Sequence, residues 1–207
     1  MALGFGKKRF PTGSTGPDRK GCRVIGVMGM GRGTGATHFT LWAANYLSAV
    51  RQRRTAVLEW NSHGDFQRLE RICAGGQRRE APFFRVLDAA YYKRGCAATL
   101  ASCMEGSYDE ILIDFGQRTK AAQTEWLRCQ VRIVTAAFSE WQLEDASGLM
   151  ELGEELGRGW ICLAAFGSEG ARREAERKLK IPVIRMPFSA DAFRVDRNAM
   201  AWFEQIL

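Results

Sequence analysis

The sequence has few of the residues that most often hold a metal ion or form a stabilising disulfide. Its two histidines are His38 and His63, and no two of its six cysteines have the C-x-x-C spacing. Because no Cys/His cluster has the spacing of metal ligands, a metal ion held only by protein side chains is not expected. The scattered cysteines are typical of reduced thiols.

Long apolar segments are also missing. No stretch reaches the roughly 18 consecutive apolar residues that a membrane-spanning helix needs. The N-terminal segment is basic but has no apolar core, so it does not have the pattern of a signal peptide. Its Gly, Pro, Ser and Thr content predicts a flexible basic leader over residues 1–21, followed by one domain over residues 22–207. We therefore expect a cytoplasmic protein that contacts a membrane only through partners.

The net charge of +7 suits an acidic partner such as nucleic acid or an anionic membrane surface. The basic cluster over residues 172–180 is interleaved with Glu174 and Glu176, which is the pattern of a solvated helix face and is the favoured interpretation. No nucleic-acid recognition motif is present, so any DNA binding would be nonspecific and sensitive to salt.

From residue 23 onwards, short apolar runs alternate with helical patterns. The runs contain four to seven residues, rich in Val, Ile, Leu or Phe, and predict strands over 23–28, 55–60, 110–115, 131–136, 160–166 and 182–186. Apolar spacing predicts helices over 37–50, 142–156 and 171–179, and residues 83–87 and 97–104 are candidates for a further strand and helix. This alternation predicts a single doubly wound α/β domain, with a mostly parallel sheet and helices on both faces.

The loop after the first predicted strand is dense in glycine. Residues 26–40 read GVMGMGRGTGATHFT and contain no lysine. Glycines between a strand and a helix let backbone N–H groups approach a phosphate, and the helix N-terminus adds partial positive charge. The loop therefore predicts a phosphate site at the carboxyl end of the first strand.

This loop resembles the deviant Walker A loop of the MinD/ParA family of P-loop ATPases, K-G-G-x-G-K-[ST]-[ST]. Gly33 and Gly35 match the spaced glycines, and Thr37 matches the hydroxyl that binds magnesium. The phosphate-binding lysine of the family falls on Ala36, and its signature lysine, which reaches across a dimer, falls on Gly31. Neighbouring Arg32 is a candidate substitute, although its planar head needs a different approach.

Motif order extends the resemblance over residues 22–207. The second strand runs into Glu59 and Asn61, where the family has two acids and the second one positions the attacking water. Asp114 matches the Walker B acid that assists magnesium, and the segments 166–168 and 181–188 resemble the late strands and the adenine-side loop. The resemblance implies these cofactor-binding residues: Gly29, Gly31, Arg32, Gly33, Thr34, Gly35, Ala36, Thr37, His38, Glu59 and Asp114, with Thr37 and Asp114 near the metal.

Gly31, Ala36 and Asn61 stand where the family has its two lysines and its water-positioning acid. The absence of these three charged side chains favours a degenerate family member with weak or lost ATP hydrolysis. In this respect the chain also resembles altered members near the CpaE/TadZ group, which help to localise pilus assembly. The resemblance implies a nucleotide sensor or a positioning scaffold with protein partners, including a homodimer. Weak binding of ATP or ADP with Mg²⁺ and no cofactor at all are equally consistent with the sequence.

Two other interpretations stay open. Gly31-x-Gly33-x-x-Ala36 fits the loose fingerprint of a Rossmann dinucleotide site, with Glu59 where a ribose-binding acid belongs. An active ATPase with an atypical loop is the second.

The two histidines have different expected roles. At the start of the helix, His38 would touch phosphate if it were protonated, but the helix dipole disfavours that charge, and a structural hydrogen bond is favoured. His63 is expected to be solvated.

The C-terminal stretch 199–207 has apolar residues on one helical side. Such a helix can target a membrane surface, as in MinD. This one is short and lacks flanking basic residues, so we expect it to dock on the protein's own core.

Overall fold

The apolar runs form one sheet, and its strand order follows the predicted alternation. The computed structural model describes residues 21–75, 80–139, 148–149, 151–153, 155 and 159–207. In these residues the sheet has eight strands in the order β3-β4-β2-β5-β1-β6-β7-β8. All neighbouring strands run parallel except β3 and β4. The strands are β1 (Arg23–Gly29), β2 (Thr55–Glu59), β3 (Phe83–Val86), β4 (Ala89–Tyr92), β5 (Glu110–Gln117), β6 (Val131–Phe138), β7 (Ile161–Gly167) and β8 (Val183–Arg185).

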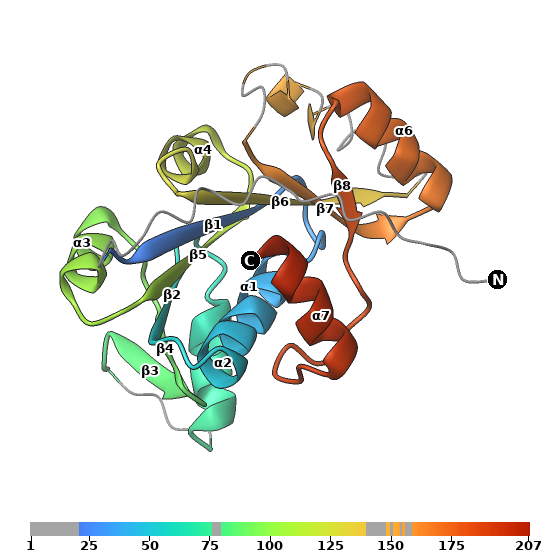
Figure 1. The fold of residues 1–207 in the computed structure, drawn as a ribbon. Coiled ribbons are helices and arrows are strands. Elements are labelled where there is room, and N and C mark those ends of the chain that lie inside the picture. The colour runs from blue at the N-terminus through green and yellow to red at the C-terminus, as the bar shows by residue number, and fades with distance from the viewer. Residues whose placement is uncertain (1–20, 76–79, 140–147, 150, 154, 156–158) are drawn as a thin grey trace.

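Helices cover both faces of this sheet (Figure 1). One apolar cluster joins one face to α1, η1, α2 and α7, and a second joins the other face to α3, α4 and α6. The prediction of a doubly wound, mostly parallel α/β fold is confirmed. The helices are α1 (Ala36–Asn45), the π-helix η1 (Tyr46–Val50), α2 (Asp65–Cys73), α3 (Ala97–Glu105), α4 (Lys120–Trp126), α6 (Glu169–Leu179) and α7 (Arg197–Ile206).

Most predicted elements lie within a few residues of those observed. The helix expected over 37–50 is α1 continued by η1, and the candidate strand and helix over 83–87 and 97–104 are β3 and α3. The helix expected over 142–156 falls largely outside the described residues. Two of its described residues, Leu149 and Leu152, are buried in the core.

Close packing on the central strand β1 depends on a glycine. A Cβ at Gly26 would lie 2.7 Å from Cys129 Sγ and 2.8 Å from Trp126 Cδ1. The absent side chain lets the Trp126 indole of α4 lie against the strand, where its N–H donates to the Gly26 and Ile133 carbonyls at 3.0 and 3.2 Å. The buried indole therefore has its hydrogen bonds while its ring fills the core.

The C-terminal helix docks on the core, as expected. Phe203 is fully buried, and its ring centroid lies 4.7 Å from that of Tyr46 and 4.8 Å from that of Trp42. At the start of α7 the Asp196 carboxylate accepts a hydrogen bond from the Ala199 N–H at 2.8 Å. An apolar anchor and an N-cap together fix α7 beside α1 (Figure 1). Among the described residues, no helix is long and apolar enough to cross a membrane.

Replacing Phe203 with alanine should destabilise the fold by about 3–5 kcal/mol, because it leaves a cavity between α7 and α1. Denaturant unfolding of the two proteins measures the difference. The exposed Gln205 on the same helix provides the control, since Gln205→Ala should change the unfolding free energy by no more than about 0.5 kcal/mol. Equal losses for both variants would contradict the assigned packing.

Candidate nucleotide-binding site

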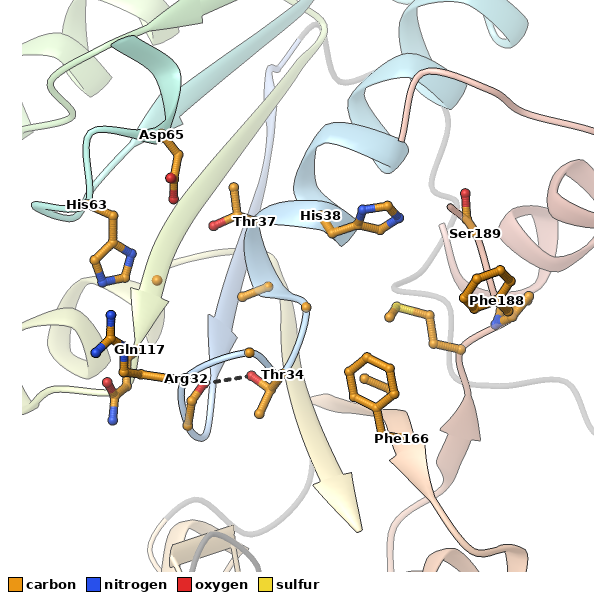
Figure 2. A pocket seen from close by; sticks show the side chains of 18 of the residues that line it. Arg32, Thr34, Thr37, His38, His63, Asp65, Gln117, Phe166, Phe188 and Ser189 are labelled. Atoms are coloured by element: carbon orange, nitrogen blue, oxygen red, sulfur yellow. Dashed lines mark hydrogen bonds between the residues drawn. The ribbon is translucent and has the colours of Figure 1, made fainter. Parts of the chain in front are cut away.

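The loops that follow the carboxyl ends of five strands enclose one cavity of about 670 Å³ (Figure 2). This edge of a parallel sheet is where α/β proteins bind ligands, and β1 lies between β5 and β6 at the point where the chain changes direction. The lining comes from the loop after β1 (Gly31, Arg32, Gly33, Thr34, Gly35, Ala36, Thr37, His38), the segment after β2 (His63, Asp65, Arg68), the end of β5 (Gly116, Gln117), β7 (Ala165, Phe166) and the segment after β8 (Met186, Pro187, Phe188, Ser189).

The loop between β1 and α1 holds its shape through its own residues. Gly33 and Gly35 have φ of 74° and 83°, a left-handed conformation that favours glycine. The buried Thr34 hydroxyl donates to the Gly31 carbonyl at 2.9 Å and lies 3.3 Å from the Thr135 hydroxyl of β6 (Figure 2). A fixed loop therefore leads into α1.

The first turn of α1 is suited to an anion. Its N-cap residue, Gly35, has no side chain that could accept hydrogen bonds from the first N–H groups of the helix, and the first turn contains no acidic residue. The free N–H groups of such a turn, and its partial positive charge, favour a phosphate. Gly33, Gly35 and Thr37 all line the cavity, so the structure brings these three predicted residues together there.

The cationic side chains of the family are replaced by small ones. Ala36 is 7% exposed and packs in the apolar cluster on its face of the sheet, and Gly31 has no side chain. No lysine is among the described residues that line the cavity. Figure 2 shows the Arg32 side chain directed towards Gln117 and away from His38, so it does not lie over the start of α1.

Asp114 lies within β5, is fully buried and neighbours Thr37. Its Oδ1 accepts a hydrogen bond from the Gly116 N–H at 2.9 Å, whereas Oδ2 accepts none of normal geometry from the described residues. Burial raises the pKa of Asp114, and the neighbouring Thr37 hydroxyl opposes this increase. An unpartnered carboxylate oxygen beside a threonine hydroxyl fits a hydrated Mg²⁺ held together with nucleotide phosphates.

Glu59 and Asn61 have structural partners instead of facing the cavity. Glu59 is buried, and its Oε1 accepts hydrogen bonds from the Asp65 and Phe66 N–H groups at 2.6 and 3.3 Å, which caps α2 where Gly64 offers no side chain. Asn61 donates to the Asp114 carbonyl at 3.0 Å and accepts from the His63 N–H at 2.9 Å. Neither residue is among those that line the cavity, so the position of Glu59 does not support the ribose-binding role of the Rossmann interpretation.

His38 differs from its expected environment, whereas His63 is exposed as expected. His38 lines the cavity, but its Nε2 is buried and makes no hydrogen bond with the described residues, so the expected structural bond is not found at that atom. Burial lowers the pKa of His38, while nearby Asp191 opposes that decrease. His63 is exposed, as expected, and also lines the cavity.

Sequence reasoning did not assign Asp65, Arg68 and Gln117 to the site. All three line the cavity, and Figure 2 shows Asp65 facing Thr37 across it. The available signal was their place after β2 and at the end of β5. The segments that resemble the adenine-side loop also reach the cavity, where Phe166 and Phe188 are 51% and 90% exposed.

Replacing Asp114 with asparagine should raise the Tm of the ligand-free protein near neutral pH. The raised pKa means that Asp114 contributes stability below its ordinary pKa of 3.8 and that this contribution is lost as pH rises through the raised value. Asparagine stays neutral, so the Tm difference should shrink as the pH falls through that value. Thermal unfolding across a pH series measures it.

The exposed Asp88 provides the control, because Asp88→Asn should not produce this pH-dependent difference. A Tm difference between wild type and Asp114→Asn that does not change with pH would contradict the conclusion that burial disfavours the charged form of Asp114.

Comparison with known proteins supports the fold. No protein-family model matches the chain, and no curated protein sequence does. Solved structures do match it. The MinC:MinD cell division complex of Aquifex aeolicus matches at 15% identity and a TM-score of 0.61, covering 82% of this chain and 83% of that one. A putative plasmid partition protein of Borrelia burgdorferi, bound to AMPPNP, matches at 11% identity and a TM-score of 0.60, covering 89% of this chain and 96% of that one.

A ParA family ATPase from Chlorobium tepidum also matches, at 16% identity and a TM-score of 0.53, covering 82% of this chain and 85% of that one. Such low identities establish a common fold and do not establish a common activity. They agree with the resemblance predicted from the glycine-rich loop, and the chain has the fold of the MinD/ParA P-loop ATPases.

Proposed function

We propose that this chain binds a nucleotide weakly, together with Mg²⁺, and uses the bound state to regulate or position protein partners, with weak or lost hydrolysis. One observation carries the proposal: the glycine-rich loop and Thr37 line the cavity, with the buried Asp114 next to Thr37, while the positions that resemble those of catalytic charge in the family hold Gly31, Ala36 and Asn61.

Free-energy magnitudes favour binding over turnover. A charge-assisted hydrogen bond from lysine contributes about 1.5–3 kcal/mol, so its loss weakens triphosphate binding by roughly ten- to 150-fold. Backbone donors and a magnesium ion still provide affinity. Phosphoryl transfer depends on positioning and on neutralising the charge that develops in the transition state. Asn61 is held by two hydrogen bonds in its turn and is not a base.

The nature of the partners is inferred from proteins of the same fold. One of them is a MinC:MinD complex and others are plasmid partition proteins. A role in an assembly or positioning system, with protein partners or a second copy of the chain, agrees with these likenesses. It also suits a nucleotide site that binds without efficient turnover.

Thermal unfolding with Mg-ATP, Mg-ADP, NAD and no ligand tests the proposal. A ligand at about 100 times its dissociation constant adds about 2.7 kcal/mol, or roughly 5–10 °C for a chain of this size. A magnesium-dependent shift with ADP or ATP supports the proposal. A shift with NAD alone would favour the Rossmann interpretation, and the absence of any shift would remove nucleotide binding from the proposal.

Replacing Ala36 with lysine should tighten Mg-ATP binding by roughly ten- to 150-fold, because it restores a charge-assisted contact at the start of α1. Isothermal titration measures the two dissociation constants. Gln205→Lys adds the same charge on the exposed face of α7, outside the cavity, and should leave the affinity unchanged. Equal affinities for wild type and Ala36→Lys would show that position 36 does not correspond to the family's lysine.

A further inference from the structure

We propose that Phe166 and Phe188 stack against the base of the bound nucleotide and supply most of its affinity. The site then takes either purine base and discriminates little between a nucleoside monophosphate and a triphosphate. This inference rests on the nucleotide binding proposed above. It names a substrate class that the glycine-rich loop does not fix, because that loop is suited to phosphate and not to the base.

Two large aromatic side chains are left uncovered at one end of the cavity. Phe166, in β7, is 51% exposed, and Phe188, after β8, is 90% exposed. Both line the cavity, together with Met186 and Pro187. Figure 2 shows both rings on the opposite side of the cavity from His63. Apolar side chains gathered at one end of a concave site are typical of a ligand-binding surface.

This aromatic end lies next to the phosphate loop. A Cβ at Gly35 would lie 3.2 Å from Met186 Cε and 3.9 Å from Ala165 Cβ, so the loop packs against both segments that carry the phenylalanines. Gly35 is also the N-cap of α1, where free N–H groups favour a phosphate. The cavity of about 670 Å³ therefore offers a phosphate site and an aromatic site side by side, within reach of one nucleotide.

The backbone around Phe166 is held by both neighbouring strands. The next residue, Gly167, has φ of 107°, and a Cβ there would overlap the Phe138 carbonyl of β6. On the other side, the Gly167 carbonyl accepts a hydrogen bond from Arg185 Nη2 of β8 at 3.1 Å. The exposed Phe166 ring is therefore presented by a fixed backbone.

The segment that carries Phe188 is also held at both ends. At its start, the Met186 N–H donates to the Ala164 carbonyl of β7 at 3.0 Å. Further along, the Phe193 carbonyl accepts from Asn45 Nδ2 of α1 at 2.7 Å. An exposed ring on a segment held in this way is preorganised for stacking, and preorganisation lowers the ordering cost of binding.

Few side chains at the aromatic end can read the edge of a base. Among the described residues that line this end, the polar side chains are those of His38 and Ser189. His38 Nε2 is buried, and Ser189 Oγ donates to the Asp191 carbonyl at 2.9 Å. Stacking by itself tolerates different bases, since every base has a π-face. Adenine and guanine should therefore bind with similar affinity.

The phosphate end contributes less than a loop that carries lysine. No lysine is among the described residues that line the cavity. Arg68 is paired with Asp65 at 2.9 Å, and Arg32 points away from the start of α1. Loss of a lysine contact costs a triphosphate roughly ten- to 150-fold in affinity, whereas stacking of a base contributes about five- to 150-fold. Base contacts therefore dominate, and additional phosphates add little.

Isothermal titration of the wild type with ATP, GTP, AMP and tripolyphosphate, each in Mg²⁺, tests the specificity. GTP should bind within about fivefold of ATP and AMP within about tenfold, whereas tripolyphosphate, which has no base, should bind at least about tenfold more weakly than ATP. A larger loss for GTP or AMP, or equal affinity for tripolyphosphate and ATP, would overturn the inference and leave nucleotide binding intact. No binding of any nucleotide would overturn both proposals.

Variants of the two phenylalanines test their role. Phe166→Ala and Phe188→Ala should each weaken ATP binding by about five- to 150-fold, and Phe188→Trp, which keeps an aromatic face, should retain it. Because Phe188 is 90% exposed, Phe188→Ala should leave the Tm of the ligand-free protein unchanged, which separates a binding role from a structural one.

Phe83→Ala is the matched control, because Phe83 is a partly exposed phenylalanine of β3 outside the cavity. This variant should bind ATP like the wild type. Wild-type ATP affinity in both Phe166→Ala and Phe188→Ala would overturn the inference. An equal loss of affinity in Phe83→Ala would overturn it as well, since the effect would then not belong to the cavity.

Discussion

The hydrogen bonds around Asp114 determine how the loops of the site are arranged. Its carbonyl accepts from the Trp60 N–H at 2.8 Å and from the Asn61 amide at 3.0 Å, which fixes the segment after β2. Its carboxylate accepts from the Gly116 N–H after β5 and neighbours Thr37 on α1. One residue therefore contacts three segments, the one after β2 through its backbone carbonyl and the other two through its carboxylate.

This arrangement explains why acidic residues near the site have different roles. Glu59 is used to cap α2, because the preceding Gly64 has no side chain that can do so. The capped turn then places Asp65 at the cavity. The motif resemblance places the Glu59 carboxylate at the site, but this carboxylate binds the backbone N–H of Asp65. Asp65, six residues further along the chain, is the acid that lines the cavity.

Much of the fold was predictable from the sequence because buried parallel strands have a strong apolar signal. The segments of β1, β2, β5, β6 and β7 are mostly apolar and buried, and Gly33, Gly35 and Thr37, which were expected at a phosphate site, line the cavity. The placement of Asp65 and Arg68 at the cavity was not predictable, since it depends on where α2 begins. That start is set by hydrogen bonds from the Asp65 and Phe66 N–H groups to the buried Glu59 carboxylate, and such a contact leaves no periodic pattern in the sequence.

The loop after β1 shows that a phosphate cradle and a catalytic charge are physically separable. Thr34, which donates to the Gly31 carbonyl and lies 3.3 Å from the Thr135 hydroxyl, and the Arg118 N–H, which donates to the Gly29 carbonyl at 2.8 Å, connect the loop to the sheet without a lysine side chain. A preorganised set of N–H donors lowers the cost of binding a phosphate. The same donors supply none of the mobile positive charge that stabilises phosphoryl transfer. Under the proposed function, such a loop would keep phosphate recognition while catalysis is weakened.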